Sequence, residues 1–239
     1  IGFWLDMQHP YVTYRTPYIE SVWWLLKQLH SKDLLYKGYT IQPYSPAAGT
    51  GLSSHELNQP GTYKPVKDTT VVAQFKVKRD TNSEFLFQDA FGEVYIIAWT
   101  TTPWTLPSNT ALTVGPKLEY VRIKTFNPYT HAPQTVVLAK SRMAAYFNAK
   151  DQDGSFADYK RDGKHIPWTI TGECYGHQLE GIRYEQLFDF AQPKDGDAFR
   201  VIGGDFVTTE DGTGVVHIAP AFGEDDYRAV IENRLYDPG

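Results

Sequence analysis

The chain has 239 residues, of which 41% are hydrophobic and 21% are charged, and its formal net charge is −5. This length allows one large domain or one domain with an appendage, and the hydrophobic fraction suffices for a core. The acidic balance argues against a domain that grips long stretches of phosphate backbone, because such binding needs many Lys and Arg contacts. Cys174 is the single cysteine. The sequence therefore excludes an intrachain disulfide framework and a cysteine zinc knuckle, and it predicts a lone buried thiol.

The sequence also bears on location. No apolar run reaches the roughly 18 residues that a membrane helix needs, and the N-terminus lacks a signal pattern. We therefore expect a soluble, cytoplasmic protein without a membrane partner. The chain begins at Ile1 without an initiator Met and stops at Gly239 without an obvious closing element, which favours a piece of a longer protein.

The first element in the chain is a predicted helix near residues 17–35. Thr16 is a suitable N-cap, and Pro17 suits the first helical position, where its missing N–H costs nothing. Apolar residues recur at helical spacing and Gly38 lies just beyond the end; these residues are Ile19, Val22, Trp23, Leu26 and Leu29. Residues 39–67 are rich in Pro, Gly, Ser and Gln, which indicates connecting loops and a boundary near residue 68.

After this boundary the pattern changes to strands. Residues 71–78 end in alternation and residues 94–99 form a compact apolar run. Further strands are predicted at 120–124, 135–138, 168–171, 199–202 and 215–218, and helices at 141–147 and 224–232. The second helix has three acids in its first turn, where the helix dipole favours negative charge. Residues 148–165 are polar and predict an exposed insertion. We expect an α+β fold, namely a β-barrel-like domain with flanking helices, preceded by a helix-plus-loop connecting segment.

The first segment with candidate site residues is residues 99–109, Trp-Thr-Thr-Thr-Pro-Trp-Thr-Leu-Pro-Ser-Asn, here called the threonine motif. Pro103 cannot continue a strand ladder and constrains the residue before it. The strand should therefore end there, with the hydroxyls of Thr100, Thr101 and Thr102 exposed at a rim. These hydroxyls would form a hydrogen-bonding platform. The alternative is that threonine serves here only as a good strand former.

The second segment, the histidine–aspartate motif, is residues 211–227, Asp-Gly-Thr-Gly-Val-Val-His-Ile-Ala-Pro-Ala-Phe-Gly-Glu-Asp-Asp-Tyr. Its pattern predicts a turn, a strand, a tight connection and a helix that starts at Glu224. His217 would lie near the end of the strand and Asp226 in the first helical turn. Taken singly, both have a structural explanation, because acids commonly serve at helix N-termini and a histidine can be a hydrogen-bonded core residue.

Together the two motifs closely resemble the isoleucyl-tRNA synthetase family. Its editing domain, inserted in the nucleotide-binding core as the first connective peptide, carries WTTTPWTLPxN and GTGxVHxAPAFGEDD, and both are present here almost letter for letter. The resemblance continues upstream through residues 11–14, 18–24 and 35–38. Valyl and leucyl relatives have an Arg after the second Thr, whereas Thr102 and Trp104 flank the proline here, which favours the isoleucyl branch.

Two departures limit what the resemblance implies. Many family members have a CPxCG knuckle where residues 45–49 read Ser-Pro-Ala-Ala-Gly, so zinc is not expected there. The HIGH-type and KMSKS-type segments that bind ATP in the synthetic site are absent, so this chain alone should not activate isoleucine. The resemblance divides the chain into a connecting segment from the synthetase core (1–68) and an editing, or deacylase, domain (69–239) that is truncated at its C-terminal end.

The resemblance implies post-transfer editing, the hydrolysis of the ester that links valine to the isoleucine tRNA. The expected partners are the 3′ end of that mischarged tRNA and the rest of the synthetase chain. No cofactor is expected for the editing domain, because ATP and magnesium would belong to the synthetic domain of a full-length protein that ligates isoleucine to its tRNA. A positioned water is the expected nucleophile, since the sequence has no G-x-S-x-G elbow and Cys174 lies outside both motifs.

The family also implies a role for each site residue. Asp226 would bind the α-ammonium group of the substrate, and a helix N-terminus favours its ionised form. His217 would exclude isoleucine, whose extra methylene would collide with it, or alternatively would orient water or contact the terminal ribose. The three threonines would hold the ester, the terminal adenosine and the water. Trp104 and Asn109 would complete the wall.

Two rival functions remain open. The first is a metal-dependent hydrolase that uses His217 with Glu224, Asp225 or Asp226, but no HExxH or paired-His spacing is present, so no metal ligand is expected. The second is a non-catalytic module that binds the tRNA 3′ end or acts as a spacer. The acidic balance disfavours general RNA binding and does not exclude such a module.

Overall fold

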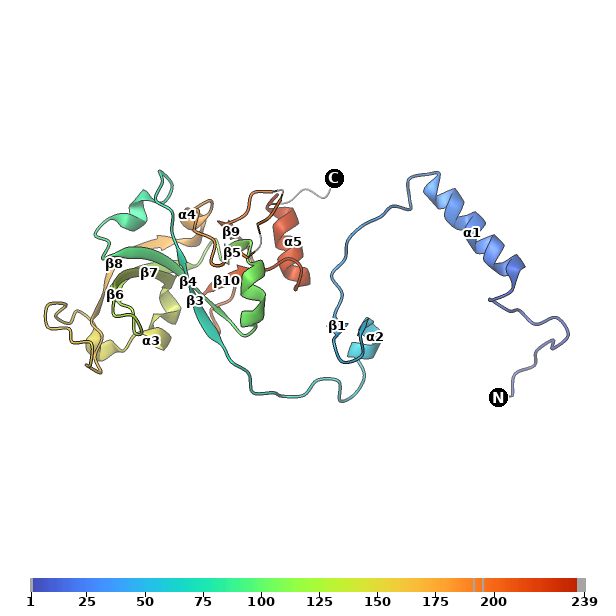
Figure 1. The fold of residues 1–239 in the computed structure, drawn as a ribbon, viewed down its shortest axis with the longest axis horizontal. Coiled ribbons are helices and arrows are strands. Elements are labelled where there is room, and N and C mark those ends of the chain that lie inside the picture. Colours follow the sequence, from blue (N-terminus) through green and yellow to red (C-terminus); the bar gives the residue numbers. More distant parts are fainter. Residues whose placement is uncertain (1, 191, 195, 236–239) are drawn as a thin grey trace. The chain divides into compact units, whose positions relative to one another are not determined.

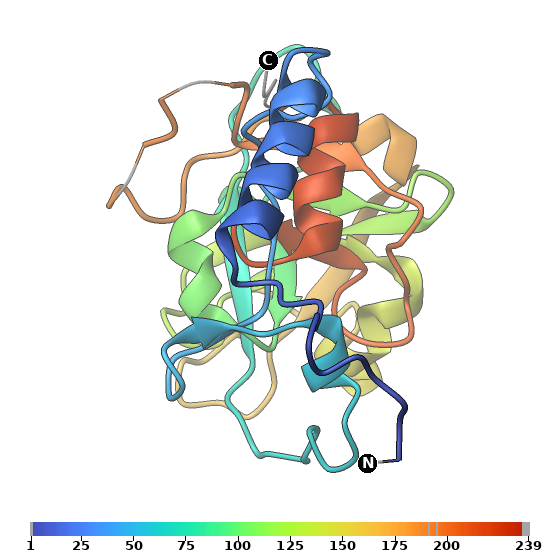
Figure 2. The same cartoon turned by 90° about the vertical axis from the view of Figure 1, so that its right-hand side faces the viewer.

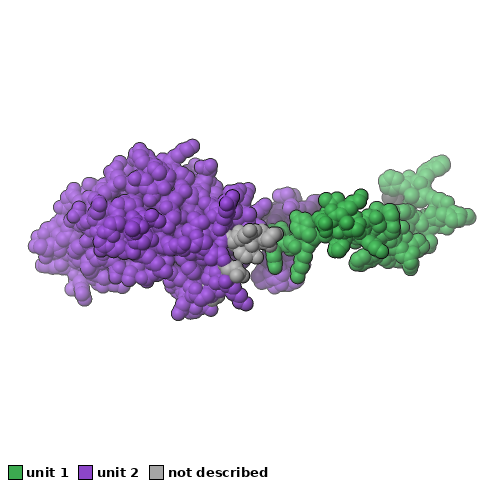
Figure 3. Space-filling model, turned by 90° about the horizontal axis from the view of Figure 1, so that it is seen from above, with its two compact units in different colours: residues 1–42 green, residues 43–239 purple. Residues whose placement is uncertain are grey.

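The computed structural model describes residues 2–190, 192–194 and 196–235. The chain divides into two compact units, residues 1–42 and residues 43–239 (Figure 3). The predicted domain boundary near residue 68 falls inside the second unit, shortly before its first long strand. The assignment of 1–68 as a connecting segment and 69–239 as an editing domain stays a prediction.

The first unit contains one helix, α1 (Thr16–His30). Two details of the predicted helix near 17–35 were wrong. Arg15, and not Thr16, is the N-cap residue, so Pro17 lies in the second helical position. The helix ends five residues early, because Asp33 adopts the left-handed conformation with φ of 56° and the Leu34 amide bonds back to the Leu29 carbonyl. No residue of α1 is buried.

The second unit contains two main sheets (Figure 1). The five-stranded sheet has the order β3-β4-β7-β6-β8 and the three-stranded sheet the order β10-β5-β9. Their strands are β3 (Val71–Lys76), β4 (Glu93–Thr100), β5 (Ala111–Val114), β6 (Glu119–Phe126), β7 (Pro133–Ala139), β8 (Trp168–Tyr175), β9 (Arg200–Gly203) and β10 (Val215–Ile218). The pairs β4–β7 and β5–β9 are parallel and the other pairs are antiparallel.

Short elements complete the unit. A small hairpin of β1 (Tyr44–Ser45) and β2 (Thr50–Gly51) precedes α2 (Ser54–Leu57). The remaining helices are α3 (Met143–Tyr146), α4 (Gly176–Leu179) and α5 (Glu224–Glu232), and the 3-10 turns are η1 (Glu84–Phe87), η2 (Pro103–Ser108), η3 (Lys140–Arg142) and η4 (Ala149–Asp151). The predicted helix at 141–147 is therefore η3 followed by α3. Residues 148–165 are mostly exposed, as predicted.

The predicted α+β class is confirmed, whereas the description as barrel-like was loose. Within the described residues, the five strands and the three strands pair in separate sheets, and no closed barrel forms. The predictions of β10 and α5 were correct to the residue, and the other predicted strands overlap the observed ones. The sequence analysis missed β5, a run of four residues that are all buried.

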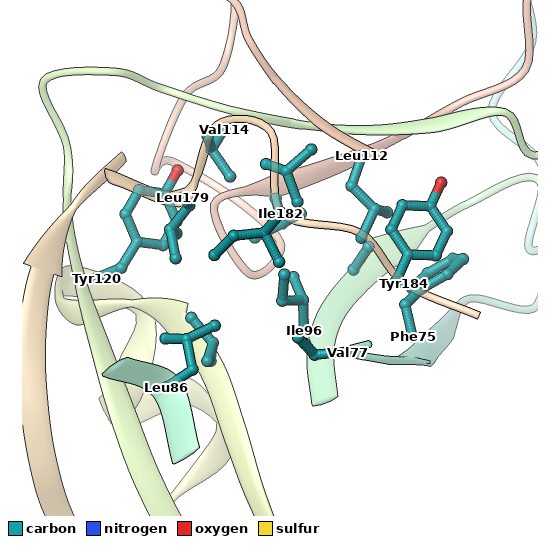
Figure 4. Close-up of a cluster of buried hydrophobic side chains, with 14 of the residues drawn as sticks. Phe75, Val77, Leu86, Ile96, Leu112, Val114, Tyr120, Leu179, Ile182 and Tyr184 are labelled. Atoms are coloured by element: carbon teal, nitrogen blue, oxygen red, sulfur yellow. The ribbon is translucent and has the colours of Figure 1, made fainter. Parts of the chain in front are cut away.

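The main hydrophobic core is built from residues of both sheets. It includes Phe75 and Ile96 from the five-stranded sheet, Leu112 from the three-stranded sheet, and Ile182 and Tyr184 from the chain after α4 (Figure 4). A separate cluster joins α5 to the three-stranded sheet, where Ala229 and Val230 pack with Ala111, Ile202 and Ile218. In Figure 2 the ribbon of α5, drawn in red, lies in front of the strands. This packing fixes the start of α5 relative to the end of β10.

Candidate functional site

The threonine motif connects the two sheets. β4 ends at Thr100, and Pro103 begins η2, which leads into β5 of the other sheet. β5 pairs with β10 so that Leu112 lies opposite His217, and β10 also lies against β4. The strand thus ends just before the proline, as predicted. The pairing of β5 with β10 brings the two motifs together, although more than a hundred residues separate them in the sequence.

A cavity of about 530 Å³ opens where the motifs meet. Six of the seven predicted site residues line it: Thr100, Thr101, Thr102, Trp104, His217 and Asp226. The lining also includes Trp99, Thr105, Phe206, Thr208, Asp211, Gly212, Thr213, Gly214, Val215, Val216 and Phe222. Its volume lies in the range of small-molecule sites. The seventh predicted residue, Asn109, is buried and lies behind His217, not on the cavity wall.

Two glycines form one side of the cavity, in the turn before β10. Gly212 and Gly214 have φ of 67° and 73°, which side-chain-bearing residues rarely adopt. A Cβ on Gly212 would lie 2.9 Å from the Trp99 ring, and one on Gly214 would collide with Ala139. The Asp-Gly-Thr-Gly sequence therefore allows this turn to close directly onto the five-stranded sheet.

The three adjacent threonines differ in their environments, contrary to the expectation that all three would be exposed. Thr100 is buried, and its hydroxyl accepts the Thr102 N–H at 3.0 Å. The Thr102 hydroxyl is half-buried and lies 3.2 Å from that of Thr100. Thr101 is exposed, and its hydroxyl makes no hydrogen bond within the described part of the chain. Thr101 is consequently the threonine whose hydroxyl remains available to a ligand.

Asp226, in the first turn of α5, brings a carboxylate to the cavity. One of its oxygens accepts the Ala219 N–H at 3.2 Å. Burial raises the pKa of Asp226, the Ala219 N–H opposes this shift, and the neighbouring Asp225 adds to it. A cation bound beside Asp226 would offset both the cost of burying the ionised carboxylate and its repulsion from Asp225. The cavity therefore favours a ligand group with positive charge.

His217 is almost fully buried, and protein atoms contact both of its ring nitrogens. Nε2 lies 2.8 Å from the Thr105 hydroxyl and Nδ1 lies 3.2 Å from the Asn109 amide nitrogen. That amide nitrogen also donates to the Ala111 carbonyl at 2.8 Å. Because a carbonyl oxygen only accepts, this contact fixes the orientation of the Asn109 amide.

The amide orientation in turn fixes the tautomer of His217. An amide NH₂ only donates, so Nδ1 must accept and the ring proton must be on Nε2. Thr105 donates its hydroxyl proton to the Thr102 carbonyl at 2.8 Å, so it is free to accept from Nε2–H. Burial lowers the pKa of His217 from 6.5 to about 4, which keeps the ring neutral. Only the carbon atoms of the ring remain to meet a ligand.

The low pKa of His217 predicts acid lability of the fold. Between pH 6.5 and about 4 the unfolded chain binds a proton that the folded chain excludes, so stability present above pH 6.5 is lost as the pH falls. The loss approaches roughly 3 kcal/mol at the lower limit, at about 1.4 kcal/mol per pKa unit. Urea unfolding of the chain and of His217→Gln across this range measures it. The variant should lack this part of the pH dependence, and two parallel curves would contradict the assignment.

Several residues that line the cavity were not predicted as site residues. Thr105 belongs to the threonine motif and could have been recognised as a fourth hydroxyl near Pro103. Phe206 and Thr208 follow β9 and carry no local signal of their position. Cys174, predicted to be buried, is half-buried on β8 outside the site, and burial raises the pKa of its thiol to about 11.

Neither metal ligands nor a membrane span is found in the described part of the chain. No group of three or more His, Cys, Asp or Glu side chains could hold a metal ion there. None of the described helices combines the length and the apolar character needed to cross a bilayer.

Comparison with known proteins gives the family to which the chain belongs. The family model of the class I tRNA synthetases for I, L, M and V matches residues 1–186. The chain therefore belongs to the class I tRNA synthetases, and the resemblance to the isoleucyl-tRNA synthetase family that the two motifs indicated is confirmed.

The chain is similar to curated isoleucine–tRNA ligases. That of Bacteroides fragilis (strain YCH46) is 61% identical over 226 residues, which cover 95% of this chain and 19% of the relative. That of Clostridium acetobutylicum is 47% identical over 226 residues, 95% of this chain and 18% of the relative. The chain thus spans about a fifth of the length of the curated relatives it matches. A crystal structure of the P. knowlesi cytosolic leucyl-tRNA synthetase editing domain has a TM-score of 0.48 at 12% identity, over 69% of this chain and 63% of that one.

Proposed function

We propose that this chain is an editing domain that hydrolyses the ester of valine wrongly attached to the isoleucine tRNA. The observation that carries the proposal is the single cavity lined by the Asp226 carboxylate, the free hydroxyl of Thr101 and the neutral ring of His217. A site for an aminoacyl ester needs these three features. They are an anion for the ammonium group, donors around the ester, and a wall that limits the side chain.

The chemical need for such a site follows from a limit on binding. One missing methylene in an apolar pocket gives only about 1–3 kcal/mol of discrimination, and isoleucyl enzymes choosing isoleucine over valine are the usual illustration of this limit. A second site that admits the smaller amino acid and rejects the larger one can remove the error. Valine fits this description, because it is smaller than isoleucine by one methylene.

In this proposal Asp226 binds the α-ammonium group through a charge-assisted hydrogen bond, using the carboxylate oxygen that Ala219 does not occupy. The ester carbonyl is then directed toward the threonine motif. A water attacks the carbonyl carbon, the bond to the ribose oxygen breaks, the ribose oxygen takes up a proton, and free valine leaves. Orientation and preorganised dipoles supply most of the acceleration, since an ester is already activated.

His217 acts in this proposal as a steric limit. Its two nitrogens already have partners in Asn109 and Thr105, which argues against a general-base role and against direct contact with the ribose. The carbon edge of the ring would meet the extra methylene of isoleucine. This steric role is favoured over the alternatives that the sequence left open.

The proposal also includes the partners, the location and the cofactors of the protein. The partners are the 3′ end of the isoleucine tRNA and the rest of a synthetase that ligates isoleucine, in the cytoplasm and away from membranes. The editing site uses no cofactor, while ATP and magnesium act at the synthetic site. This chain alone should therefore deacylate and not aminoacylate.

The different environments of the threonines give a separable prediction. Thr101→Val should slow hydrolysis by about 10-fold with little change in stability, because it removes a free hydroxyl from the cavity. Thr100→Val should cost about 1 kcal/mol of stability, because it removes the acceptor of the Thr102 N–H. Deacylation rates and urea unfolding of both variants measure the two effects. Equal stability losses would contradict the different roles.

Multiple-turnover release of valine from Val-tRNA tests the proposed function against its rivals. A catalytic site releases many equivalents of valine per chain, and it does so unchanged in the presence of a chelator. Binding of the mischarged tRNA without turnover would support the non-catalytic module instead. Loss of activity with the chelator would support a metal-dependent hydrolase.

A further inference from the structure

Tyr184 lies outside both motifs, on the far side of Asn109 from His217. It is fully buried, and its hydroxyl donates to the Asn109 carbonyl oxygen at 2.7 Å. The Asn109 amide nitrogen faces Nδ1 of His217. A continuous chain of hydrogen bonds therefore runs from the hydrophobic core to the ring that limits the cavity.

The ring of Tyr184 is held firmly. It packs edge-on against Phe75, with ring centroids 5.3 Å apart, and against Phe199 at 6.2 Å. Its backbone amide bonds to the Phe199 carbonyl at 3.1 Å. In Figure 4 the Tyr184 ring lies beside Phe75, with its hydroxyl oxygen at the edge of the labelled cluster. The hydroxyl is therefore a fixed donor, and burial raises the pKa of Tyr184, which keeps it protonated.

Donor and acceptor capacity leaves one arrangement for these groups. The Asn109 carbonyl oxygen must accept from Tyr184, because the amide nitrogen is committed to the Ala111 carbonyl and to His217. Without the Tyr184 hydroxyl, the Asn109 oxygen would be buried without this partner, and the Ala111 carbonyl alone would oppose rotation of the amide. Rotation would present an oxygen to Nδ1 of His217 and would favour the opposite tautomer.

We propose that Tyr184 is a positioning residue that sets the size limit of the cavity, because its hydroxyl, together with the Ala111 carbonyl, holds the Asn109 amide in one orientation and thereby sets the tautomer and position of His217. The effect on substrate choice rests on the proposed editing function, whereas the effect on the His217 tautomer does not. Tyr184 does not line the cavity, and its hydroxyl is connected to His217 through Asn109.

Tyr184→Phe tests this inference, because it removes one oxygen and keeps the ring. Two readouts are compared with the unmodified chain: the ratio of Ile-tRNA to Val-tRNA hydrolysis, and the ¹⁵N spectrum of His217, identified with His217→Gln. We expect the ratio to rise by about 3- to 10-fold, as loss of one hydrogen bond implies. We also expect the His217 nitrogens to change from a pure Nε2–H pattern to a mixture of tautomers.

Thr125→Val is the control, because it also removes one buried hydroxyl group and nearly keeps the volume of the side chain. Thr125 is buried on β6, its hydroxyl donates to the Pro167 carbonyl at 3.1 Å, and it does not line the cavity. It should lose comparable stability while the hydrolysis ratio and the His217 spectrum stay unchanged. Equal changes in both variants would overturn the inference, because they would indicate general loosening of the core. Unchanged readouts in Tyr184→Phe would overturn it as well.

Two further outcomes remain informative. If the unmodified chain hydrolyses neither tRNA, the proposed function fails, and the His217 spectra alone decide the positioning role. If Tyr184→Phe does not fold, the unmodified chain still carries a test. Its Tyr184 hydroxyl proton should exchange slowly and lie close to the Asn109 amide in nuclear Overhauser spectra. A rapidly exchanging hydroxyl would contradict the inference.

Discussion

Replacing Asp226 with alanine is expected to slow hydrolysis of Val-tRNA by roughly 10- to 100-fold, the effect of removing a hydrogen bond to a charged group. The proposed ammonium group would lose the carboxylate of Asp226, and the ester would lose its orientation toward the threonine motif. Stability should change by no more than about 1 kcal/mol, because removal of a carboxylate whose ionised form burial makes unfavourable offsets the loss of the acceptor of the Ala219 N–H. Steady-state deacylation rates and urea unfolding measure the two effects.

The adjacent acid provides a matched control for this variant. Asp225 lies in the same helical turn, but its side chain is 66% exposed, pairs with Arg228 and does not line the cavity. Asp225→Ala removes the same charge from the start of α5 and should leave hydrolysis nearly unchanged. If both variants lost activity equally, the charge at the helix start would matter and specific binding by Asp226 would be excluded.

Replacing His217 with alanine is expected to relax the size limit. The proposed wall would recede, and the rate of Ile-tRNA hydrolysis relative to Val-tRNA should rise by about 10- to 100-fold, corresponding to the 1–3 kcal/mol that one methylene can contribute. Hydrolysis of Val-tRNA itself should fall far less. This outcome differs from that of a general base, whose loss would slow both substrates together.

The effect of His217→Ala on stability needs its own measurement, because the Asn109 amide and the Thr105 hydroxyl each lose the buried contact that the ring provides and keep only their other hydrogen bonds. His217→Gln retains polar atoms at this position and gives a second variant that should fold more readily. His131→Ala is the control and should leave the Ile-to-Val ratio unchanged. His131 does not line the cavity, and its ring bonds at 2.7 Å to Tyr159, which belongs to the exposed insertion. An unaltered Ile-to-Val ratio in both His217 variants would count against the steric role.

Local chemistry explains which parts could be predicted from the sequence. β10 and α5 follow strong signals, a turn at Asp211-Gly212 and three acids that begin a helix, and both were predicted to the residue. The end of β4 before Pro103 was equally predictable, because proline cannot continue the ladder. The motifs also identified six residues that line one cavity.

The other parts depend on contacts that are distant in the sequence. β5 was missed because its four residues carry no periodicity, and its pairing with β10 and β9 defines it. The burial of Thr100 and the position of Asn109 behind His217 follow from packing between the two sheets. Tyr184 gave no signal, because a tyrosine in a core is ordinary and its role depends on a partner 75 residues away.

The central claim is that this cavity hydrolyses the smaller aminoacyl ester selectively. The most direct test measures deacylation of Val-tRNA and Ile-tRNA, both carried on the isoleucine acceptor, by this chain. We expect rapid release of valine, with isoleucine released at least about 10-fold more slowly. Equal rates for the two esters, or no release of valine, would contradict the proposed function.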